Sequence, residues 1–206
     1  MKTVTVSEKI FLSISAIIFL LSAINPHDYL TWFMEVSPAM IGFTIIAYKW
    51  NSFRLSRFML ILICIHSWIL FVGGHYTYAE VPAGFWVRDA LGLARNHYDR
   101  VGHFIQGFQP AFLARELLLR NKVVKKDDWW LKYIVVSICL GFSAFYELIE
   151  FAAAMILGGS AESFLGTQGD IWDTQKDMLL ALIGSLVALM LAGFHDKSIK
   201  KLTLPS

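Results

Sequence analysis

The stretch that decides the fold begins at position 95 and ends at position 110, and it reads Arg95-Asn96-His97-Tyr98-Asp99-Arg100-Val101-Gly102-His103-Phe104-Ile105-Gln106-Gly107-Phe108-Gln109-Pro110. Its apolar residues recur near helical spacing, which predicts a helix. Asp99, His103, Gln106 and Pro110 are four, three and four residues apart, so they share one face of that helix. A polar stripe on a lipid-compatible helix costs free energy unless it meets partners inside a bundle. We therefore expect the rest of the chain to supply those partners.

The composition of the whole chain is that of a membrane protein. Of its 206 residues 56% are hydrophobic and 17% are charged, and the mean hydropathy is +0.55. A soluble globular protein is about 45–50% apolar. We predict an all-α, polytopic helix bundle in which residues 1–206 form a single integral membrane domain. Cys64 and Cys139 lie in apolar runs, where small core or lipid-facing side chains are expected.

Six apolar runs predict about six transmembrane helices, at residues 10–24, 29–48, 58–76, 95–119, 133–157 and 178–194. The first run is short and also resembles a signal peptide, but Leu21-Ser22-Ala23 is a poor cleavage site, and we expect it to be retained. Residues 77–96 are mixed and predict a loop with a short amphipathic helix. Of the 18 lysines and arginines, 14 fall on the side of the chain termini. This bias predicts that both termini are cytoplasmic.

That orientation places acids and histidines of three helices at similar depth near the outer face. We predict His103, Glu147, Glu150 and Asp173 as the acid–base, catalytic candidates. Candidate substrate-binding residues are Asp99, Arg100, Gln106, Lys176 and Asp177. Ionisable groups inside a membrane are expensive to maintain, which favours a functional interpretation of the set. A structural interpretation stays open for single members, because Asp170 or Asp173 would cap a helix with a gain of about 1 kcal/mol.

A divalent metal is one functional interpretation of the same groups. The candidate ligands are His97, His103, Glu147, Glu150, Asp170 and Asp173. Carboxylates with histidine suit Zn, Mn or Fe, and carboxylates alone suit Mg or Ca. However, no His-Glu-x-x-His motif occurs. Nucleophile-elbow, phosphate-loop and dinucleotide signatures are also missing from the sequence. The identity of any cofactor is therefore left open.

Five motifs spread over nearly the whole chain resemble the YjdF family of bacterial inner-membrane proteins. They include His27-Asp28-Tyr29, Gly73-Gly74-His75-Tyr76, Asp99-Arg100-Val101-Gly102-His103, Tyr146-Glu147-Leu148-Ile149-Glu150 and Gly169-Asp170-Ile171-Trp172-Asp173. The resemblance implies a location in the bacterial inner membrane and a helical fold, but it implies no reaction. More distantly, the second half is similar to the VanZ-like pattern, which is linked to glycopeptide tolerance. Here Arg100, Glu150 and Leu180 depart from that pattern.

Three functions fit these observations. The first is a periplasm-facing site that binds or acts on a lipid or a cell-envelope precursor. The second is a small transporter or proton-coupled carrier, which the apolar stretches 133–144 and 186–194 disfavour. The third is a non-catalytic structural or partner-binding membrane protein. As for partners, the lysines of residues 122–126 beside Trp129 and Trp130 predict contact with anionic membrane lipids rather than nucleic acid.

Overall fold

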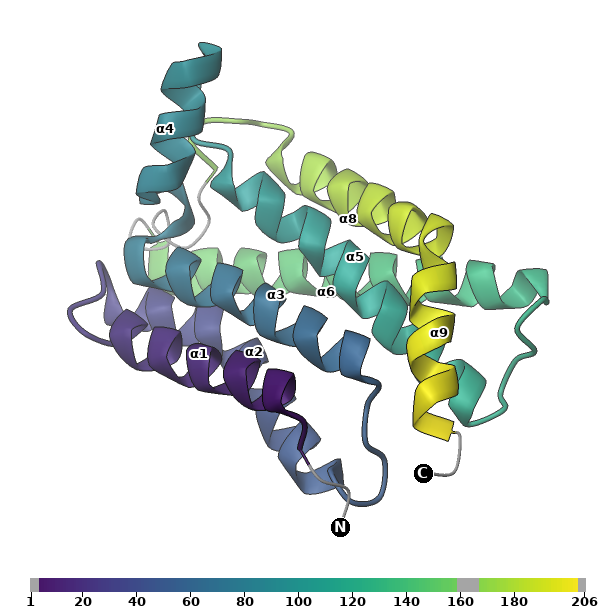
Figure 1. The fold of residues 1–206 in the computed structure, drawn as a ribbon. Helices are drawn as coiled ribbons and strands as arrows, with labels where there is room; N and C mark the ends of the chain where they lie inside the picture. Colours follow the sequence, from purple (N-terminus) through teal and green to yellow (C-terminus); the bar gives the residue numbers. More distant parts are fainter. Residues whose placement is uncertain (1–3, 159–166, 204–206) are drawn as a thin grey trace.

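The computed structural model describes residues 4–158 and 167–203, which form eight α-helices and one 3-10 turn (Figure 1). The helices are α1 (Val6–Ser22), α2 (Tyr29–Lys49), α3 (Arg57–Tyr76), α4 (Pro82–Leu91), α5 (Tyr98–Arg120), α6 (Trp129–Leu157), α8 (Asp173–Met190) and α9 (Ala192–Thr203), and the 3-10 turn is η1 (Tyr78–Glu80). The predicted all-α class is confirmed. The short helix expected between residues 77 and 96 is α4.

Polar caps fix where several of these helices begin. The carboxylate of Asp28 accepts a hydrogen bond from the N–H of Thr31 at 2.7 Å and so starts α2. Thr5 and Glu8 form a capping box at the start of α1, and Ser56 caps α3. Such caps satisfy backbone N–H groups that have no partner within the helix. The apolar runs therefore become helices with defined starting points.

Three helices, α2, α3 and α6, are long and apolar enough to cross a membrane, and the pair formed by α8 and α9 makes a fourth candidate if it counts as one bent span. The helix α1 has only 17 residues. The helix α5 carries charged side chains in both its first and its last turn. These two helices are therefore not candidates by length and composition alone, although six spans were expected from the sequence.

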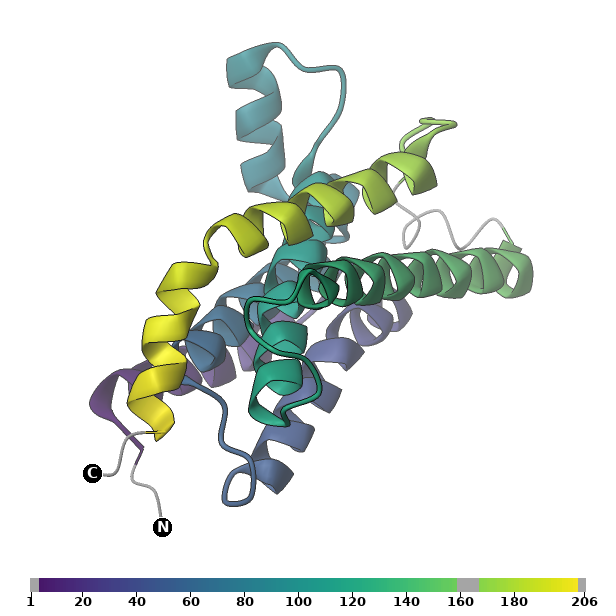
Figure 2. The same ribbon diagram turned by 90° about the vertical axis from the view of Figure 1, so that its right-hand side faces the viewer.

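The last predicted run differs from the structure. A single helix over residues 178–194 was expected, but α8 begins at Asp173 and ends at Met190, and α9 follows at an angle of 61°. Figure 2 shows α9 turned away from the direction of α8. The turn brings His195 and Asp196 against α5, where His195 Nε2 lies 2.9 Å from a carboxylate oxygen of Glu116. These buried polar contacts account for the bend.

The contact between α5 and α8 is the most extensive between any two helices in the described part of the chain, and two glycines let the backbones approach. A Cβ atom at Gly107 would overlap the carbonyl group of Ala181, and one at Gly184 would overlap the carbonyl group of Phe104. Small residues are typical of helix contacts in membranes because they let backbones approach.

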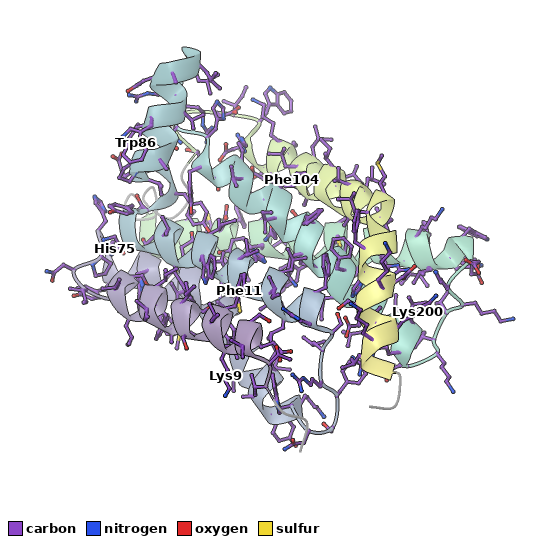
Figure 3. The ribbon with its side chains drawn as sticks, viewed as in Figure 1. Lys9, Phe11, His75, Trp86, Phe104 and Lys200 are labelled. Carbon is purple, nitrogen blue, oxygen red and sulfur yellow. The ribbon has the colours of Figure 1, made fainter. Side chains whose placement is uncertain are left out.

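The bundle has two distinct ends. At the first, which we call the terminal end, Arg54 pairs with Glu8, and the N–H of Phe58 donates to Ser198 Oγ at 3.1 Å. The opposite end, which we call the site end, holds the starts of α5 and α8 and the end of α3. Figure 3 shows Lys9 and Lys200 toward the terminal end and His75 and Trp86 at the other. An apolar core of α3, α5, α6 and α8 residues lies between, including Met59, Phe112 and Val135.

Candidate functional site

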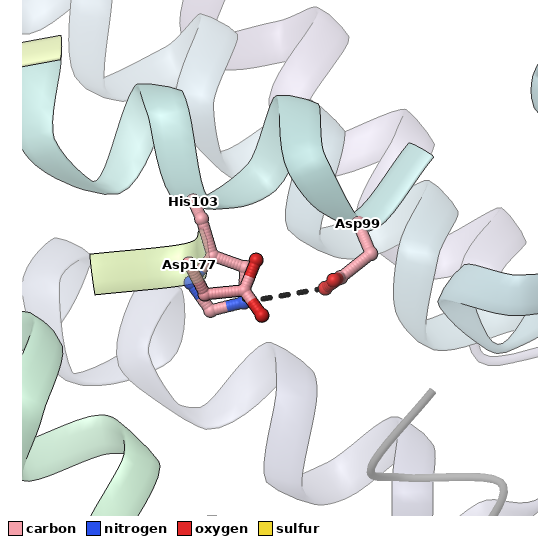
Figure 4. A group of neighbouring side chains, drawn as sticks. All are labelled: Asp99, His103 and Asp177. Carbon is pink, nitrogen blue, oxygen red and sulfur yellow. Dashed lines mark ion pairs between the residues drawn. The ribbon is translucent and has the colours of Figure 1, made fainter. Parts of the chain in front are cut away.

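The centre of the candidate site is His103, whose side chain is 7% exposed. Its Nε2 atom lies 3.3 Å from Asp99 Oδ1, one helical turn earlier on α5, and 3.9 Å from Asp177 Oδ1 on α8 (Figure 4). Its Nδ1 atom lies 2.9 Å from Gln106 Oε1. Asp99 and Gln106 share with His103 the face of α5 that the residue spacing predicted. The imidazole ring is therefore held at both nitrogens.

Arg100 connects this histidine to the acids at the start of α8. Its Nη2 atom donates hydrogen bonds to Asp173 Oδ1 at 2.5 Å and to Asp170 Oδ2 at 3.1 Å, and its Nη1 atom donates to Asp177 Oδ1. Arg95 also donates to Asp173 Oδ1, at 2.9 Å. Hydrogen bonds between ions are stronger than neutral ones, so this network fixes the register between α5 and α8.

The helix α6 contributes Glu147 and Glu150. Glu147 Oε1 lies 3.9 Å from His103 Nδ1 and is buried without a hydrogen-bond partner among the described residues. Asp99 Oδ2 is likewise buried without one. Buried polar atoms nearly always have partners, so each of these two oxygens calls for an explanation. Glu150 lies one helical turn beyond Glu147 and lines a cavity.

A cavity of about 960 Å³ begins at the site end and continues toward the terminal end. At its polar end lie Glu35, Tyr78, Asp99, His103, Tyr146 and Glu150. Farther along, the wall is formed mainly by apolar residues of α2, α5 and α6, such as Ile46, Leu113 and Phe142. The described wall reaches Lys49 and Ser52. The cavity therefore has a polar end and a longer apolar part.

The comparisons with known proteins agree with this architecture. The family model described as "Predicted membrane protein (DUF2238)" matches residues 8–198. The chain belongs to this family. It is 45% identical over 189 residues to "Inner membrane protein YjdF" of Escherichia coli (strain K12), covering 91% of this chain and 90% of that protein. No solved structure matches the chain.

Membership of the DUF2238 family confirms the resemblance that the five motifs predicted and places the chain in the bacterial inner membrane. The geometry adds what the family description does not contain. The predicted residues Asp99, Arg100, His103, Gln106, Glu147, Asp173 and Asp177 lie in one continuous network. Their roles in binding or catalysis stay predictions.

Three predicted site residues lie at the rim of the network. Lys176 Nζ donates to Asp170 Oδ2 at 2.6 Å, and this hydrogen bond lowers the pKa of Asp170. Burial, reinforced by Arg95 and Arg100, lowers the pKa of His97, which favours the neutral ring at neutral pH. Among the described residues, the atoms that lie close enough to share a metal ion belong to Asp99, His103 and Asp177. Of the six predicted metal ligands, this trio contains His103 alone.

Three residues at the polar end of the cavity were not predicted as site residues from the sequence. Tyr146 Oη donates a hydrogen bond to Glu35 Oε2 at 3.2 Å. The ring of Tyr78 occupies a slot where Gly73 and Gly102 have no side chain. A signal for Glu35 was present, because an acid within an apolar run is a functional candidate. Glu35, Tyr78 and Tyr146 belong to three separate elements, α2, η1 and α6, and no sequence pattern connects them.

A second buried polar cluster lies at the terminal end and was not predicted either. Glu116 is fully buried and accepts hydrogen bonds from the N–H and hydroxyl of Ser56, from Arg120 and from His195. Beside it, Arg115 and Lys126 pair with Asp196. Both carboxylate oxygens of Glu116 accept hydrogen bonds, which indicates that this residue has a structural role in holding α3, α5 and α9 together.

Proposed function

We propose that this protein is an inner-membrane binding protein for a lipid or lipid-linked cell-envelope precursor. The hydrocarbon chain occupies the apolar body of the cavity, and the polar head lies among the acids of the site end. The observation that carries the proposal is the cavity itself: its volume of about 960 Å³ lies in the usual range for ligand sites, about 300–1,000 Å³. Its wall changes from polar to apolar along its length.

The charges at the polar end favour a head group that bears an amine or several hydrogen-bond donors. Glu35, Asp99 and Glu150 line this part of the cavity. Arg100, a predicted substrate-binding residue, pairs with Asp170, Asp173 and Asp177 instead. Carboxylates that face a cationic head are stabilised by it, whereas an anionic head would be repelled. Arg100 and Lys176 then act by positioning the acids.

If the protein also transforms its ligand, His103, Glu147 and Glu150 are placed to move protons. Glu147 faces the Nδ1 side of His103, and Glu150 faces the cavity. A general base must come within hydrogen-bond reach of the proton it removes. We assign Asp173 a positioning role, because it pairs with Arg95 and Arg100 and is not part of the cavity wall.

The proposal includes a topology. We propose that residues 1–206 form one membrane domain in which α1, α2, α3, α5, α6 and the pair α8–α9 cross the membrane. Both termini then lie in the cytoplasm and the site end faces the periplasm. This arrangement is supported by the charge bias of the sequence and by the contacts that gather both chain ends at the terminal end.

A matched pair of glycine variants tests the proposal. A Cβ atom at Gly42 or at Gly141 meets nothing within 4 Å, but only Gly42 belongs to the described cavity wall. We expect Gly42→Phe to reduce the lipid that co-purifies with the protein, as measured by extraction and mass spectrometry. Gly141→Phe should retain the wild-type amount. Equal lipid retention by both variants would overturn the proposal.

A proton-coupled carrier is the second candidate. It is favoured by the length of the cavity, whose wall runs from Glu35 past His66 and Gln109 to Lys49, with His66 Nδ1 2.9 Å from Gln109 Oε1. A carrier predicts proton movement in vesicles that contain the purified protein and a pH-sensitive dye. Binding alone predicts none above the rate of vesicles without protein.

A further inference from the structure

We propose that Asp99, His103 and Asp177 bind one divalent transition-metal ion, with Mn²⁺ or Zn²⁺ as the best-suited ions. This ligand set differs from the one that sequence reasoning suggested, and it needs no lipid to be bound. The residues come from two helices that the glycine contacts hold in close register. Each offers one ligand atom, and these atoms lie within 4.8 Å of one another.

The distances suit a shared metal ion. His103 Nε2 is 3.3 Å from Asp99 Oδ1 and 3.9 Å from Asp177 Oδ1. Metal–ligand bonds of about 2.0–2.2 Å place neighbouring ligand atoms about 3–4 Å apart. Two carboxylates with one imidazole form a mixed set that suits Mn, Fe or Zn better than Ca or Mg, which prefer oxygen ligands alone.

The other side of the imidazole ring is arranged as in a metal-binding histidine. His103 Nδ1 faces Gln106 Oε1 at 2.9 Å, and the same nitrogen faces Glu147 Oε1 at 3.9 Å. Both oxygens are acceptors, so they favour a proton on Nδ1. The lone pair of Nε2 then faces two carboxylates, and this arrangement is favourable when a positive charge, either a second ring proton or a metal ion, lies between them. Metal-bound histidines typically have their second nitrogen fixed in this way.

Two orphaned oxygens point to a missing partner. Asp99 Oδ2 and Glu147 Oε1 are buried without hydrogen-bond partners among the described residues, and each residue is only 8% exposed. Their ion-pair contacts are long, at 3.8 Å to Arg100 Nη1 and 3.9 Å to His103 Nδ1. Glu147 comes from α6, so it is independent of the two helices that carry the ligands. An unsatisfied buried carboxylate is costly. A cation at His103 would attract both oxygens and reduce that cost.

Acidic side chains outnumber basic ones around the proposed metal site, which favours binding of a cation. The carboxylates of the network and of the polar end of the cavity are those of Glu35, Asp99, Glu147, Glu150, Asp170, Asp173 and Asp177. The basic side chains that pair with them are Arg95, Arg100 and Lys176. Carboxylates in such excess are stabilised by protons or by a further cation. A divalent ion supplies two positive charges where the acids are most crowded.

The test is metal binding by the full-length protein in detergent, stripped with EDTA and titrated with MnCl₂ or ZnCl₂ in a calorimeter. Metal content after dialysis is measured by mass spectrometry. We expect one equivalent to bind, and we expect Asp99→Asn, Asp177→Asn and His103→Gln each to weaken binding at least about tenfold. Asp89→Asn is the matched control, because Asp89 is an exposed acid that pairs with Arg88.

A second variant covers the case in which a ligand variant fails to fold. Gln106→Leu keeps all three ligands but removes the acceptor that orients His103, so we expect binding to weaken by about 10–100-fold. The proposal is overturned if the wild-type protein binds no stoichiometric metal. It is equally overturned if folded Asp99→Asn, Asp177→Asn or Gln106→Leu protein binds metal as tightly as the wild type. The lipid experiment is run in EDTA, so either proposal can fail alone.

Discussion

Gly107 of α5 lies directly against the backbone carbonyl group of Ala181 in α8, with no room for a side chain between them. This contact sets the distance between the two helices that carry His103 and Asp177. The network of the site end therefore depends on a backbone contact that involves no charged group.

Enlarging Gly107 should separate the two helices. We expect Gly107→Val to lower the free energy of unfolding by about 1–3 kcal/mol, because the added side chain overpacks a tight contact. The control is Gly141→Val, since a Cβ atom there meets nothing within 4 Å. Thermal unfolding in detergent measures the difference. Equal unfolding temperatures for the two variants would show that the helices are not in close contact.

Neutralising Arg100 should remove one ion-pair partner from each of three acids. Arg100 pairs with Asp170, Asp173 and Asp177, and its side chain is only 12% exposed. Breaking a buried ion pair from one side typically costs about 3–5 kcal/mol, so we expect Arg100→Gln to be strongly destabilised. Arg88→Gln, at a more exposed pair, should cost no more than about 1 kcal/mol. Similar losses for both variants would contradict the buried network.

Glu116 should be as important for stability as the acids of the site end, although it lies at the terminal end. Its carboxylate accepts hydrogen bonds from Ser56, Arg120 and His195. We expect Glu116→Ala to lose about 3–5 kcal/mol, because buried donors are left unpaired. The exposed Asp127→Ala should change stability by less than about 0.5 kcal/mol. A Glu116→Ala protein with wild-type stability would exclude the structural role.

The pairing of Asp170 should make stability depend on pH in the acid range. Its hydrogen bond with Lys176 holds the pKa of Asp170 below its ordinary value of 3.8. A depressed folded-state pKa stabilises the protein above the unfolded value, and this contribution is lost as pH falls through the folded value. Asp170→Asn should therefore unfold at a lower temperature than wild type at about pH 7, and the difference should vanish well below pH 3.8. A difference that grows in acid would contradict this pairing.

The topology can be checked with single cysteines. Cys64 and Cys139 are buried and should react little. Cysteine is introduced at Ser52, in the connection between α2 and α3, or at Asp89, in α4. We expect a membrane-impermeant maleimide to label Asp89→Cys in cells whose outer membrane is permeabilised, and to label Ser52→Cys only after lysis. The reverse pattern would place the site end in the cytoplasm.

The sequence predicted most of the helices because most apolar runs are long and several helices begin at polar caps. It also predicted the shared face of Asp99, His103 and Gln106, since helical spacing is local information. The bend at Leu191 was not predictable, because it depends on a contact between Glu116 and His195, which are 79 residues apart.

The polar head of the cavity illustrates the same limit. Glu35 is recognisable as an acid in an apolar run, but its partner Tyr146 is 111 residues away along the chain. The ligand trio for a metal could not be separated from the other acids, because the choice depends on which acids of α5 and α8 lie beside His103. Only tertiary packing decides that orientation.

The central claim, that a lipid occupies the cavity with its head at the site end, is tested most directly by photo-crosslinking. The protein is reconstituted with phosphatidylethanolamine that carries a photoreactive group either on the head or at the end of an acyl chain, and the labelled peptides are mapped by mass spectrometry. We predict that the head probe labels residues around Glu35 and Tyr146, and that the chain probe labels the cavity wall around Ile46 and Leu113. Labelling confined to side chains outside the cavity wall, such as Ile41 and Met190, would contradict the account.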